Sequence, residues 1–550
     1  MKEKELQFIP LGGLGEVGRN MMVFKYGDQY LIVDCGVQFP DNSMIGVDYI
    51  IPDMQFLQGK EDKIVGIVIT HAHEDHIGGL VHLFNLIENV PIYTTPLTAG
   101  MIEVKLARAN KLSRTQLIVK KAGEMFDLGA FHIELFHMTH SIPDAVGLAI
   151  TTPAGLVVVS GDYKFDPTPI DNWPSDYAKL GEIGTRNVLA LFSDSTNAER
   201  PGHTPSEKDI NHAFEDVFAN AKGRIIISSF ASLISRLQQL SVIARRHHRK
   251  ICIVGTSMVD NVNLAKKLGY LDLPDEWIIS LEEALHLPDK EVLILCTGSQ
   301  GEPTSIMGRL STGKYYAFSI KVGDTVMLSS HPIPGNEERV SALINRLYRM
   351  GANVIYQSLL SVHVSGHACQ EEMKLLINLV KPKYFIPVHG ELRHLYNHAK
   401  IGLQMGIPED HIFVVENGQT INFRNGKAKL GEQVPASVVL VDGANVGDMN
   451  FDIMHQRERL ADSGVIVVTL LMNKDSHRLR QDPQIVHYGL MIGAEAPDIE
   501  EDLQKSIVEF IEKRNPGTNN LEKNLEQLTR KFIYNATHRS PWVIVNPIYV

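Results

Sequence analysis

The sequence predicts a mixed α/β protein with more than one domain. Its 550 residues exceed the roughly 250–300 residues at which single hydrophobic cores stop growing. Residues 7–195 contain short strand-like runs separated by Gly-rich turns, and residues 205–365 alternate between helical and strand patterns. The second rhythm is typical of a parallel α/β sheet. Two different sheet architectures are therefore expected along the chain.

In the first region, polar side chains follow the predicted strands. The run "KIVGIVIT" is β-branched and apolar, which indicates a strand covered on both faces. The cluster "HAHEDH" comes directly after it, and "IGGLVHLFNLIENV" then has helical spacing, so the cluster lies on a strand-to-helix loop. Two further predicted strands end at His140 and Asp162. Ionisable groups are thus expected to gather where strands end.

The remaining elements divide the chain further. Predicted strands such as "RIIISSF" and "EVLILCTGSQGEP" end in loops rich in Ser and Gly, where parallel sheets bind ligands. "KYFIPVHGELRHL" repeats the strand–His–helix layout at His389, so the first domain is expected to resume there. The expected limits are a first domain made of residues 1–200 and 369–425, an inserted domain at 201–368, a linker at 426–446 and a small C-terminal α/β domain at 447–550.

Composition narrows the class of protein. Hydrophobic residues make up 44% and charged residues 21%, which is ordinary for a globular protein in water. No apolar run reaches the roughly 18 residues of a membrane span, and the N-terminus has no apolar core of a secretory signal. The four cysteines are scattered, so we expect a reducing cytoplasm rather than a disulfide framework. The net charge of −11 argues against general coating of nucleic acid but allows a local basic groove.

The spacing within the cluster predicts metal binding. Residues two apart in an extended segment point the same way, so His71 and His73 can bind one cation. Asp75 and His76 then turn to the other side and can bind a second. Imidazole and carboxylate suit Zn²⁺ or Mn²⁺. More ligands must come from other strand ends, and His140, Asp162 and His389 are the candidates. Glu74 is expected to face solvent or to support a ligand, and a plain polar helix start is the alternative for the whole cluster.

These motifs resemble a known family. "THAHEDH", with His140 and the "SGD" at Asp162, is similar to the metallo-β-lactamase superfamily. "SDSTNAERPG" with Asp194, "HVSGHA" with His367 and "PVHGE" with His389 resemble the three motifs of its β-CASP branch. "GGLGEVGRN", "SSHPIPGNE" and "VDGANVGD" resemble segments of the ribonuclease J family. The resemblance covers nearly the whole chain. It implies an αββα metallo-β-lactamase sandwich with an inserted parallel α/β β-CASP domain and a small C-terminal α/β domain.

The resemblance also implies site residues and their roles. His71, His73, His140 and Asp162 would hold one metal, and Asp75, His76, Asp162 and His389 the other, with zinc expected and manganese as the alternative. Asp75, Asp194 and His367 are the implied catalytic residues: Asp194 would orient a histidine ligand, and His367 would contact the scissile phosphate. Ser232, Ser365 and Gly366, with His367, would bind the substrate phosphate. The family's Asn after "FAS" is replaced by Leu233, which removes one expected polar contact.

The implied activity is hydrolysis of single-stranded RNA by a two-metal mechanism. The family resemblance implies a 5′→3′ exonuclease that prefers 5′-monophosphate ends, with endonuclease activity in addition, acting in RNA maturation and decay. The C-terminal domain is expected to form homodimers or homotetramers, and components of an RNA decay complex are expected partners. "IVHYGLM" departs from the family's pattern in that domain.

Three other functions compete with this one. A small-molecule metallohydrolase of the same fold, such as a lactonase, needs neither the long insert nor "HVSGHA". A non-catalytic RNA-binding subunit of a decay complex is expected to have lost ligand motifs, whereas all seven candidate ligands are present here. A β-CASP enzyme that processes DNA or mRNA 3′ ends is the third, and "VDGANVGD" favours the ribonuclease J branch over it.

Overall fold

The computed structural model describes residues 5–41, 44–333, 335–443, 445–447, 451–490, 499–514 and 520–550. The segments "SSHPIPGNE" and "VDGANVGD" therefore lie partly outside the described residues. The chain forms two compact units, one made of residues 1–41 and 49–439 and the other of residues 42–48 and 440–550. Among the described helices, none combines the length and the apolar character needed to span a bilayer.

The first unit contains two large sheets that pack face to face. Alternating apolar residues of Leu6–Gly12 and of Phe131–His137 bury their side chains in one shared core, since each strand turns its apolar face toward the opposite sheet. The first sheet is, in spatial order, β23 (Lys427–Gln433), β22 (Gln419–Arg424), β1 (Leu6–Gly12), β3 (Met21–Tyr26), β4 (Gln29–Val33), β6 (Ile64–Val68), β7 (Ile92–Thr94) and β8 (Leu117–Val119). The second is β20 (Tyr384–Val388), β13 (Ala190–Asp194), β12 (Gly155–Val159), β11 (Val146–Thr152), β10 (Phe131–His137) and β9 (Met125–Leu128).

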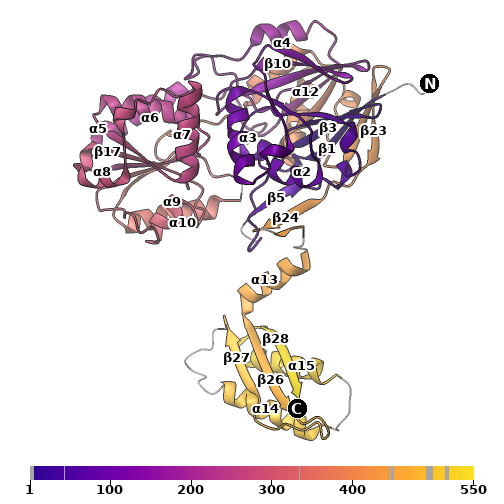
Figure 1. Ribbon diagram of the computed structural model, residues 1–550, viewed down its shortest axis with the longest axis vertical. Coiled ribbons are helices and arrows are strands. Elements are labelled where there is room, and N and C mark those ends of the chain that lie inside the picture. The colour runs from indigo at the N-terminus through magenta and orange to yellow at the C-terminus, as the bar shows by residue number, and fades with distance from the viewer. Residues whose placement is uncertain are drawn as a thin grey trace. The chain divides into compact units, whose positions relative to one another are not determined.

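Helices cover the outer faces of both sheets. A second core joins the outer face of the β13–β20 sheet to three helices, α4 (Tyr177–Ile183), α11 (Gln370–Val380) and α12 (Leu392–Gln404). On the other side, α2 (Leu80–Leu86) and α3 (Pro96–Arg108) connect the parallel strands β6, β7 and β8 and bury their apolar faces. The order helix, sheet, sheet, helix is the αββα sandwich (Figure 1). Two short strands, β2 (Leu14–Gly15) and β21 (Gly390–Glu391), pair in parallel beside it, and β5 (Tyr49–Pro52) completes this part of the chain.

The inserted domain is a parallel sheet with helices on both faces (Figure 1). Its strands in spatial order are β16 (Ile278–Ile279), β15 (Lys250–Val254), β17 (Val292–Cys296), β14 (Ile225–Ser228), β18 (Thr325–Leu328) and β19 (Asn353–Ile355). Its helices are α5 (Asn211–Asn220), α6 (Ile234–Arg246), α7 (Thr256–Leu268), α8 (Leu281–His286), α9 (Ile306–Ser311) and α10 (Glu337–Arg349). Since all these strands run in one direction, their carboxyl ends form one edge, which carries the Ser- and Gly-rich loops.

The expected linker at 426–446 differs from the structure in its first half. Residues Lys427–Gln433 form β23, which pairs antiparallel with β22 at the edge of the first large sheet. Its alternation of charged and small residues suits an edge strand with solvent on one face, which is why "KAKLGEQ" has the composition of a linker. β24 (Val438–Asp442) and the short β25 (Asn445–Val446) follow.

The second unit is a small α/β domain. Its sheet has the order β27 (Gln484–Tyr488), β26 (Val465–Met472) and β28 (Trp542–Tyr549), with β26 and β28 parallel. Buried and partly exposed residues alternate strictly along β26. Its buried side chains form a core with α14 (Ile499–Lys513) and α15 (Leu521–Thr537), while α13 (Phe451–Ser463) precedes the sheet.

Candidate metal centre

The His/Asp cluster lies on the loop that leaves β6. His71 and His76 are buried, and the short helix α1 (Glu74–Ile77) begins inside the cluster. This loop packs directly on backbone: a Cβ added to Gly36 would lie 1.6 Å from the carbonyl oxygen of Asp75. Backbone hydrogen bonds from Gly79 to Cys35 and from Cys35 to His76 fix the same contact. Backbone contacts with Cys35 and Gly36 therefore hold the loop of the cluster in place without a bound metal.

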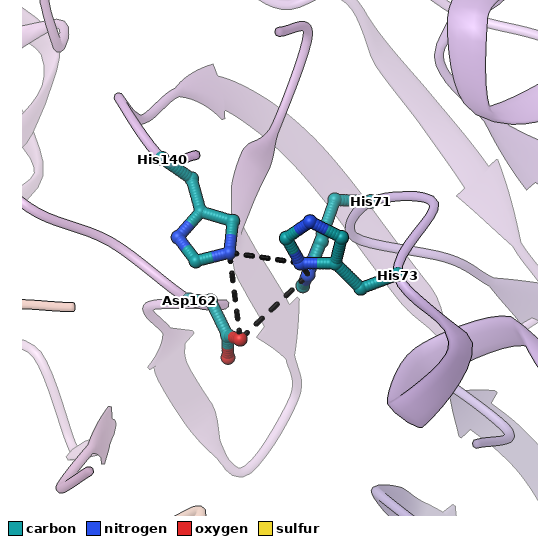
Figure 2. Close-up of side chains that lie close together, drawn as sticks. All are labelled: His71, His73, His140 and Asp162. Carbon is teal, nitrogen blue, oxygen red and sulfur yellow. Dashed lines mark hydrogen bonds and ion pairs between the residues drawn. The ribbon is translucent and has the colours of Figure 1, made fainter. Parts of the chain in front are cut away.

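Three imidazoles and a carboxylate form the first group of candidate ligands. His73 Nδ1 lies 3.1 Å from His71 Nε2 and 3.0 Å from His140 Nε2. Asp162 Oδ2 lies 3.6 Å from the same His71 nitrogen and 3.8 Å from that of His140 (Figure 2). The four atoms all fall within 4.8 Å of one another. Three imidazole nitrogens and a carboxylate oxygen gathered in one small space are a set of atoms that can bind a divalent cation.

The second group shares Asp162 with the first. Asp162 Oδ2 lies 3.2 Å from His76 Nε2, and Asp162 Oδ1 accepts a 2.8 Å hydrogen bond from His389 Nδ1. Asp75 Oδ2 lies 3.7 Å from His76 Nε2 and 3.5 Å from His389 Nε2. One carboxylate thus stands between two sets of nitrogen donors. These two groups contain the residues that the family resemblance implied for each metal, and His140, Asp162 and His389 come to the cluster from other strand ends.

Two buried atoms show that this space suits cations. Asp162 Oδ2 and His389 Nε2 have no hydrogen-bond partner of acceptable geometry among the described residues, although both are buried. A buried polar atom without a partner costs free energy unless an ion or water satisfies it. Burial raises the pKa of Asp162, but the imidazoles of His389 and His76 outweigh burial and hold that pKa well below its usual value. The charged carboxylate is the form that binds a cation.

The two groups differ in the protonation they favour. Burial lowers the pKa of His73 to about 4, and it lowers the pKa of His71 and His140 well below the usual value. Burial also lowers the pKa of His389, yet Asp162 and Asp75 outweigh it and raise that pKa to about 10. Neutral imidazole is the ligand form of histidine. The histidines of the first group are therefore already in the form that binds a cation, whereas His389 of the second group must lose a proton before it can bind one.

Asp194 lies against His367 rather than a histidine of the two groups. Asp194 Oδ2 accepts a 2.8 Å hydrogen bond from His367 Nδ1, while Asp194 Oδ1 is 3.8 Å from His389 Nδ1. The resemblance had implied that Asp194 orients a ligand histidine, so the structure differs on this point. The reason is geometric, since His389 Nδ1 already donates to Asp162. Burial lowers the pKa of His367, but Asp194 outweighs it and raises that pKa.

The expected phosphate-binding residues lie on two loops. Ser365 Oγ accepts hydrogen bonds from Asn197 Nδ2 (2.9 Å) and from the His367 backbone N–H (3.2 Å). The carbonyl of Gly366 accepts a 2.8 Å hydrogen bond from His140 Nδ1, which ties this loop to the first group. Ser232 lies on the loop that follows β14, partly exposed. The next side chain, Leu233, is buried, so that position offers no polar contact to a ligand.

Asp34 is a supporting residue that the sequence reasoning missed. Its Oδ2 lies 2.8 Å from His76 Nδ1, and its Oδ1 accepts a 2.8 Å hydrogen bond from the Thr70 backbone N–H. It therefore fixes which nitrogen of His76 faces the centre. The signal was available, since "YLIVDCG" is another apolar strand that ends in a carboxylate. Glu74, in contrast, is about half-exposed and pairs with Lys105, which agrees with a solvent-facing position.

Comparisons with known proteins give matches along most of the chain. Family models match four segments: "Metallo-beta-lactamase superfamily" at residues 14–205, "Ribonuclease J, beta-CASP domain" at 222–347, "Zn-dependent metallo-hydrolase RNA specificity domain" at 351–413 and "Ribonuclease J C-terminal domain" at 452–550. Ribonuclease J of Synechocystis sp. is 40% identical over 553 residues, which cover 98% of this chain and 86% of that protein. The chain belongs to the ribonuclease J family.

Other relatives of the ribonuclease J family match over a similar length. Ribonuclease J of Thermus thermophilus is 44% identical, with 86% of this chain and 83% of that protein covered. Ribonuclease J2 of Bacillus subtilis is 38% identical, with 99% of both chains covered. A solved structure from Enterococcus faecalis, of unknown function, has a TM-score of 0.53 at 15% identity and covers 76% of this chain and all of that one. It supports the fold alone. The predicted αββα sandwich with its β-CASP insert and C-terminal domain is confirmed.

Proposed function

We propose that this ribonuclease J family member hydrolyses single-stranded RNA from its 5′ end with two divalent cations at the centre. Membership of the family makes the protein a metal-dependent ribonuclease. The observation that carries the finer proposal is the shared carboxylate: Asp162 belongs to two overlapping groups of potential ligands. Two adjacent cations on one bridging carboxylate are the arrangement that hydrolyses phosphodiesters in many enzymes.

The ligand assignment follows the two groups. His71, His73, His140 and Asp162 would hold one cation, and Asp75, His76, Asp162 and His389 the other, with zinc as the expected metal and manganese as the alternative. Cations bound there would lower the pKa of water and neutralise charge that develops on the phosphoryl oxygens. Asp75 would also be counted among the catalytic residues, because it faces both His76 and His389.

His367 is proposed as the proton donor to the leaving 3′ oxygen. Asp194 binds its Nδ1 at 2.8 Å, which leaves Nε2 as the nitrogen available to substrate. Burial opposes the charged form, but Asp194 raises the pKa of His367, so the imidazolium persists to higher pH and has a proton to give. Such general acid catalysis typically contributes about 10²–10⁴-fold.

The 5′ end of RNA is proposed to bind at Ser365, Gly366 and Ser232. A terminal monophosphate needs several donors, and hydroxyl and backbone N–H groups at strand ends are suited to supply them. Leu233 contributes none, so we expect a weaker preference for 5′-monophosphate than in relatives with a polar residue there. Endonuclease activity on the same centre is proposed as a secondary activity.

Assembly and domain limits complete the proposal. The exposed face of the β27–β26–β28 sheet carries apolar side chains such as Val486, Ile544 and Ile548. We propose that it supports a homodimer or homotetramer, which acts in the cytoplasm on RNA decay and maturation, with components of a decay complex as partners. The catalytic core would be residues 1–200 and 369–425 and the RNA-binding insert residues 201–368, with residues 447–550 reserved for assembly.

One experiment tests the function. The same RNA is prepared with a 5′-monophosphate, a 5′-triphosphate or a 5′-hydroxyl and digested over time, with metal content measured in parallel. The proposal expects two metals per chain and fastest release of mononucleotides from the monophosphate. Internal fragments as the first products of all three RNAs would overturn the 5′→3′ direction, and a metal-loaded protein that leaves all three intact would overturn the activity.

A further inference from the structure

A chain of buried charges crosses the junction between the core and the insert. Lys164, two residues after Asp162, has its ammonium group 3.4 Å from Asp166 Oδ2 and 3.7 Å from Glu207 Oε1. Arg236 Nη2 donates to Glu207 Oε2 at 2.9 Å. All four side chains are at least 95% buried. Two acids and two bases thus alternate without net charge from the Asp162 loop to helix α6.

This series of buried charges begins at the loops that carry candidate ligands. The Lys164 backbone N–H donates to the Thr139 carbonyl at 2.8 Å, and Thr139 directly precedes His140. Glu207 is tied to the same loop, since its own backbone N–H donates to Asp166 Oδ2 at 3.0 Å. The carboxylate that meets Arg236 is therefore fixed relative to the metal centre.

At its other end, Arg236 binds the loop that leads to the proposed RNA-binding residues. Its Nη1 donates to the Val362 carbonyl at 2.8 Å and also to Ser329 Oγ, and that hydroxyl donates to the same carbonyl at 2.6 Å. Val362 opens residues 362–367, the stretch that includes Ser365 and His367. Arg236 Nε is held in turn by Gln239 at 3.1 Å. A planar guanidinium with five donors can make all of these contacts at once, which an ammonium cannot.

We propose that Arg236 is a positioning residue of the ribonuclease, which fixes residues 362–367 at the distance from the metal centre that RNA cleavage requires. The inference rests on the proposed function, because it assigns its purpose to His367 and Ser365. Arg236 touches neither substrate nor metal ligands, and it acts through Glu207 on one side and the Val362 carbonyl on the other. A misplacement of about 1 Å in a catalytic group can lower the rate by about 10²-fold.

The inserted domain offers a matched control at the opposite end of the paired strands β14 and β18. Arg224 is equally buried, binds Asp324 through Nε at 3.0 Å and donates to the Ser319 carbonyl at 2.9 Å. Each arginine also packs on a phenylalanine ring, Phe214 for Arg236 and Phe318 for Arg224. Arg224 and Asp324 precede β14 and β18, whereas Ser329, which Arg236 contacts, follows β18, so Asp324 and Ser329 are about 16 Å apart along the strand direction.

The test compares Arg236→Lys with Arg224→Lys in the metal-loaded full-length protein. Four quantities are measured: metal content, thermal midpoint, cleavage of 5′-monophosphorylated RNA, and cleavage of bis(para-nitrophenyl) phosphate, a small diester with a good leaving group. Arg236→Lys is expected to keep its metals and its diester activity within about threefold, while kcat on RNA falls about 10–100-fold. Both substitutions are expected to lower the thermal midpoint by a similar amount. Arg224→Lys is expected to keep kcat on RNA within about threefold of wild type.

Two outcomes overturn the inference alone. One is a folded Arg236→Lys protein with wild-type kcat on RNA, and the other is an equal loss of kcat in Arg224→Lys. Should the single variants fail to fold, the doubles Glu207→Gln/Arg236→Met and Asp324→Asn/Arg224→Met remove both charges of each pair and leave no unpaired buried ion. They carry the same expectations. A metal-loaded wild-type protein that cleaves the diester but not RNA would overturn the proposed function, and the role of Arg236 with it.

Discussion

The two regions that meet at the centre are held in different ways. The candidate ligands of the lactamase core contact one another directly, as in the 3.0 Å approach of His73 to His140, and most of them are fully buried. Residues 362–367 are held at the centre by separate hydrogen bonds: His367 donates to Asp194, Asn197 donates to Ser365, Arg236 and Ser329 donate to the Val362 carbonyl, and the Gly366 carbonyl accepts from His140. The His367 side chain is still 21% exposed. We therefore expect metal retention and RNA cleavage to be separable by substitution, because largely different contacts support them.

The largest expected effect comes from the shared carboxylate. Asp162→Asn removes the charge that both groups use, so both cations are expected to be lost or greatly weakened. RNA cleavage should fall by at least about 10⁴-fold, a modest share of the acceleration that enzymes achieve. Metal content is measured by elemental analysis beside the rate. A variant that keeps two metals and cleaves RNA normally would show that Asp162 does not bridge them.

Removal of the His367 side chain should lower RNA cleavage without loss of metal, the opposite pattern to loss of a shared ligand. His367→Ala is expected to keep both metals and to lower kcat about 10²–10⁴-fold, because it removes a proton donor and no ligand. Parallel measurement of metal content and single-turnover rate checks this. Loss of one metal in this variant would instead place His367 in the metal-binding group, with Asp194 as its companion.

Asp34→Asn should weaken metal binding by an intermediate amount. Asp34 accepts from His76 Nδ1, and the loss of such a supporting carboxylate typically lowers metal affinity about 10–100-fold. Competition with a chelator measures the affinity. Glu74→Gln is the matched control, since Glu74 lies in the same cluster but is half-exposed and pairs with Lys105. The metal affinity and the rate of this variant should stay near wild type. Equal losses in both variants would argue for a general charge effect.

The smallest expected effect is at the phosphate loop. Ser365→Ala removes one hydroxyl, and one hydrogen bond contributes about 0.5–1.5 kcal/mol, so KM for 5′-monophosphorylated RNA should rise about two- to tenfold. KM for 5′-hydroxyl RNA should stay unchanged, and this second substrate serves as the control. An equal rise for both RNAs would mean that Ser365 supports the loop and does not bind the terminal phosphate.

Local patterns were sufficient for the elements and for the cluster. "KIVGIVIT" predicted β6, and the alternation of the cluster predicted two groups of ligands, because neighbouring side chains on an extended segment point in fixed directions. Composition misled at β23, since an exposed edge strand has the same small and charged residues as a linker. Asp34 was missed although it follows a strand as Asp162 does, because one carboxylate after a strand is also a common turn residue.

The pairing of distant groups was beyond local reasoning. Whether Asp194 meets His367 or His389 depends on which donor is already taken, and Asp162 takes His389 only in the folded protein. The contacts among Lys164, Glu207 and Arg236 were equally unpredictable from the sequence, since each of these residues by itself looks like an ordinary surface charge.

The sequence by itself determined the residue types of the centre, their grouping along the cluster and the family, since those depend on order and spacing in the chain. Only the tertiary structure decided which partner each side chain has. Partners depend on distances in space between loops that can be more than 200 residues apart in the sequence, as His140 and Gly366 are. Those distances follow from how the two sheets and the insert pack.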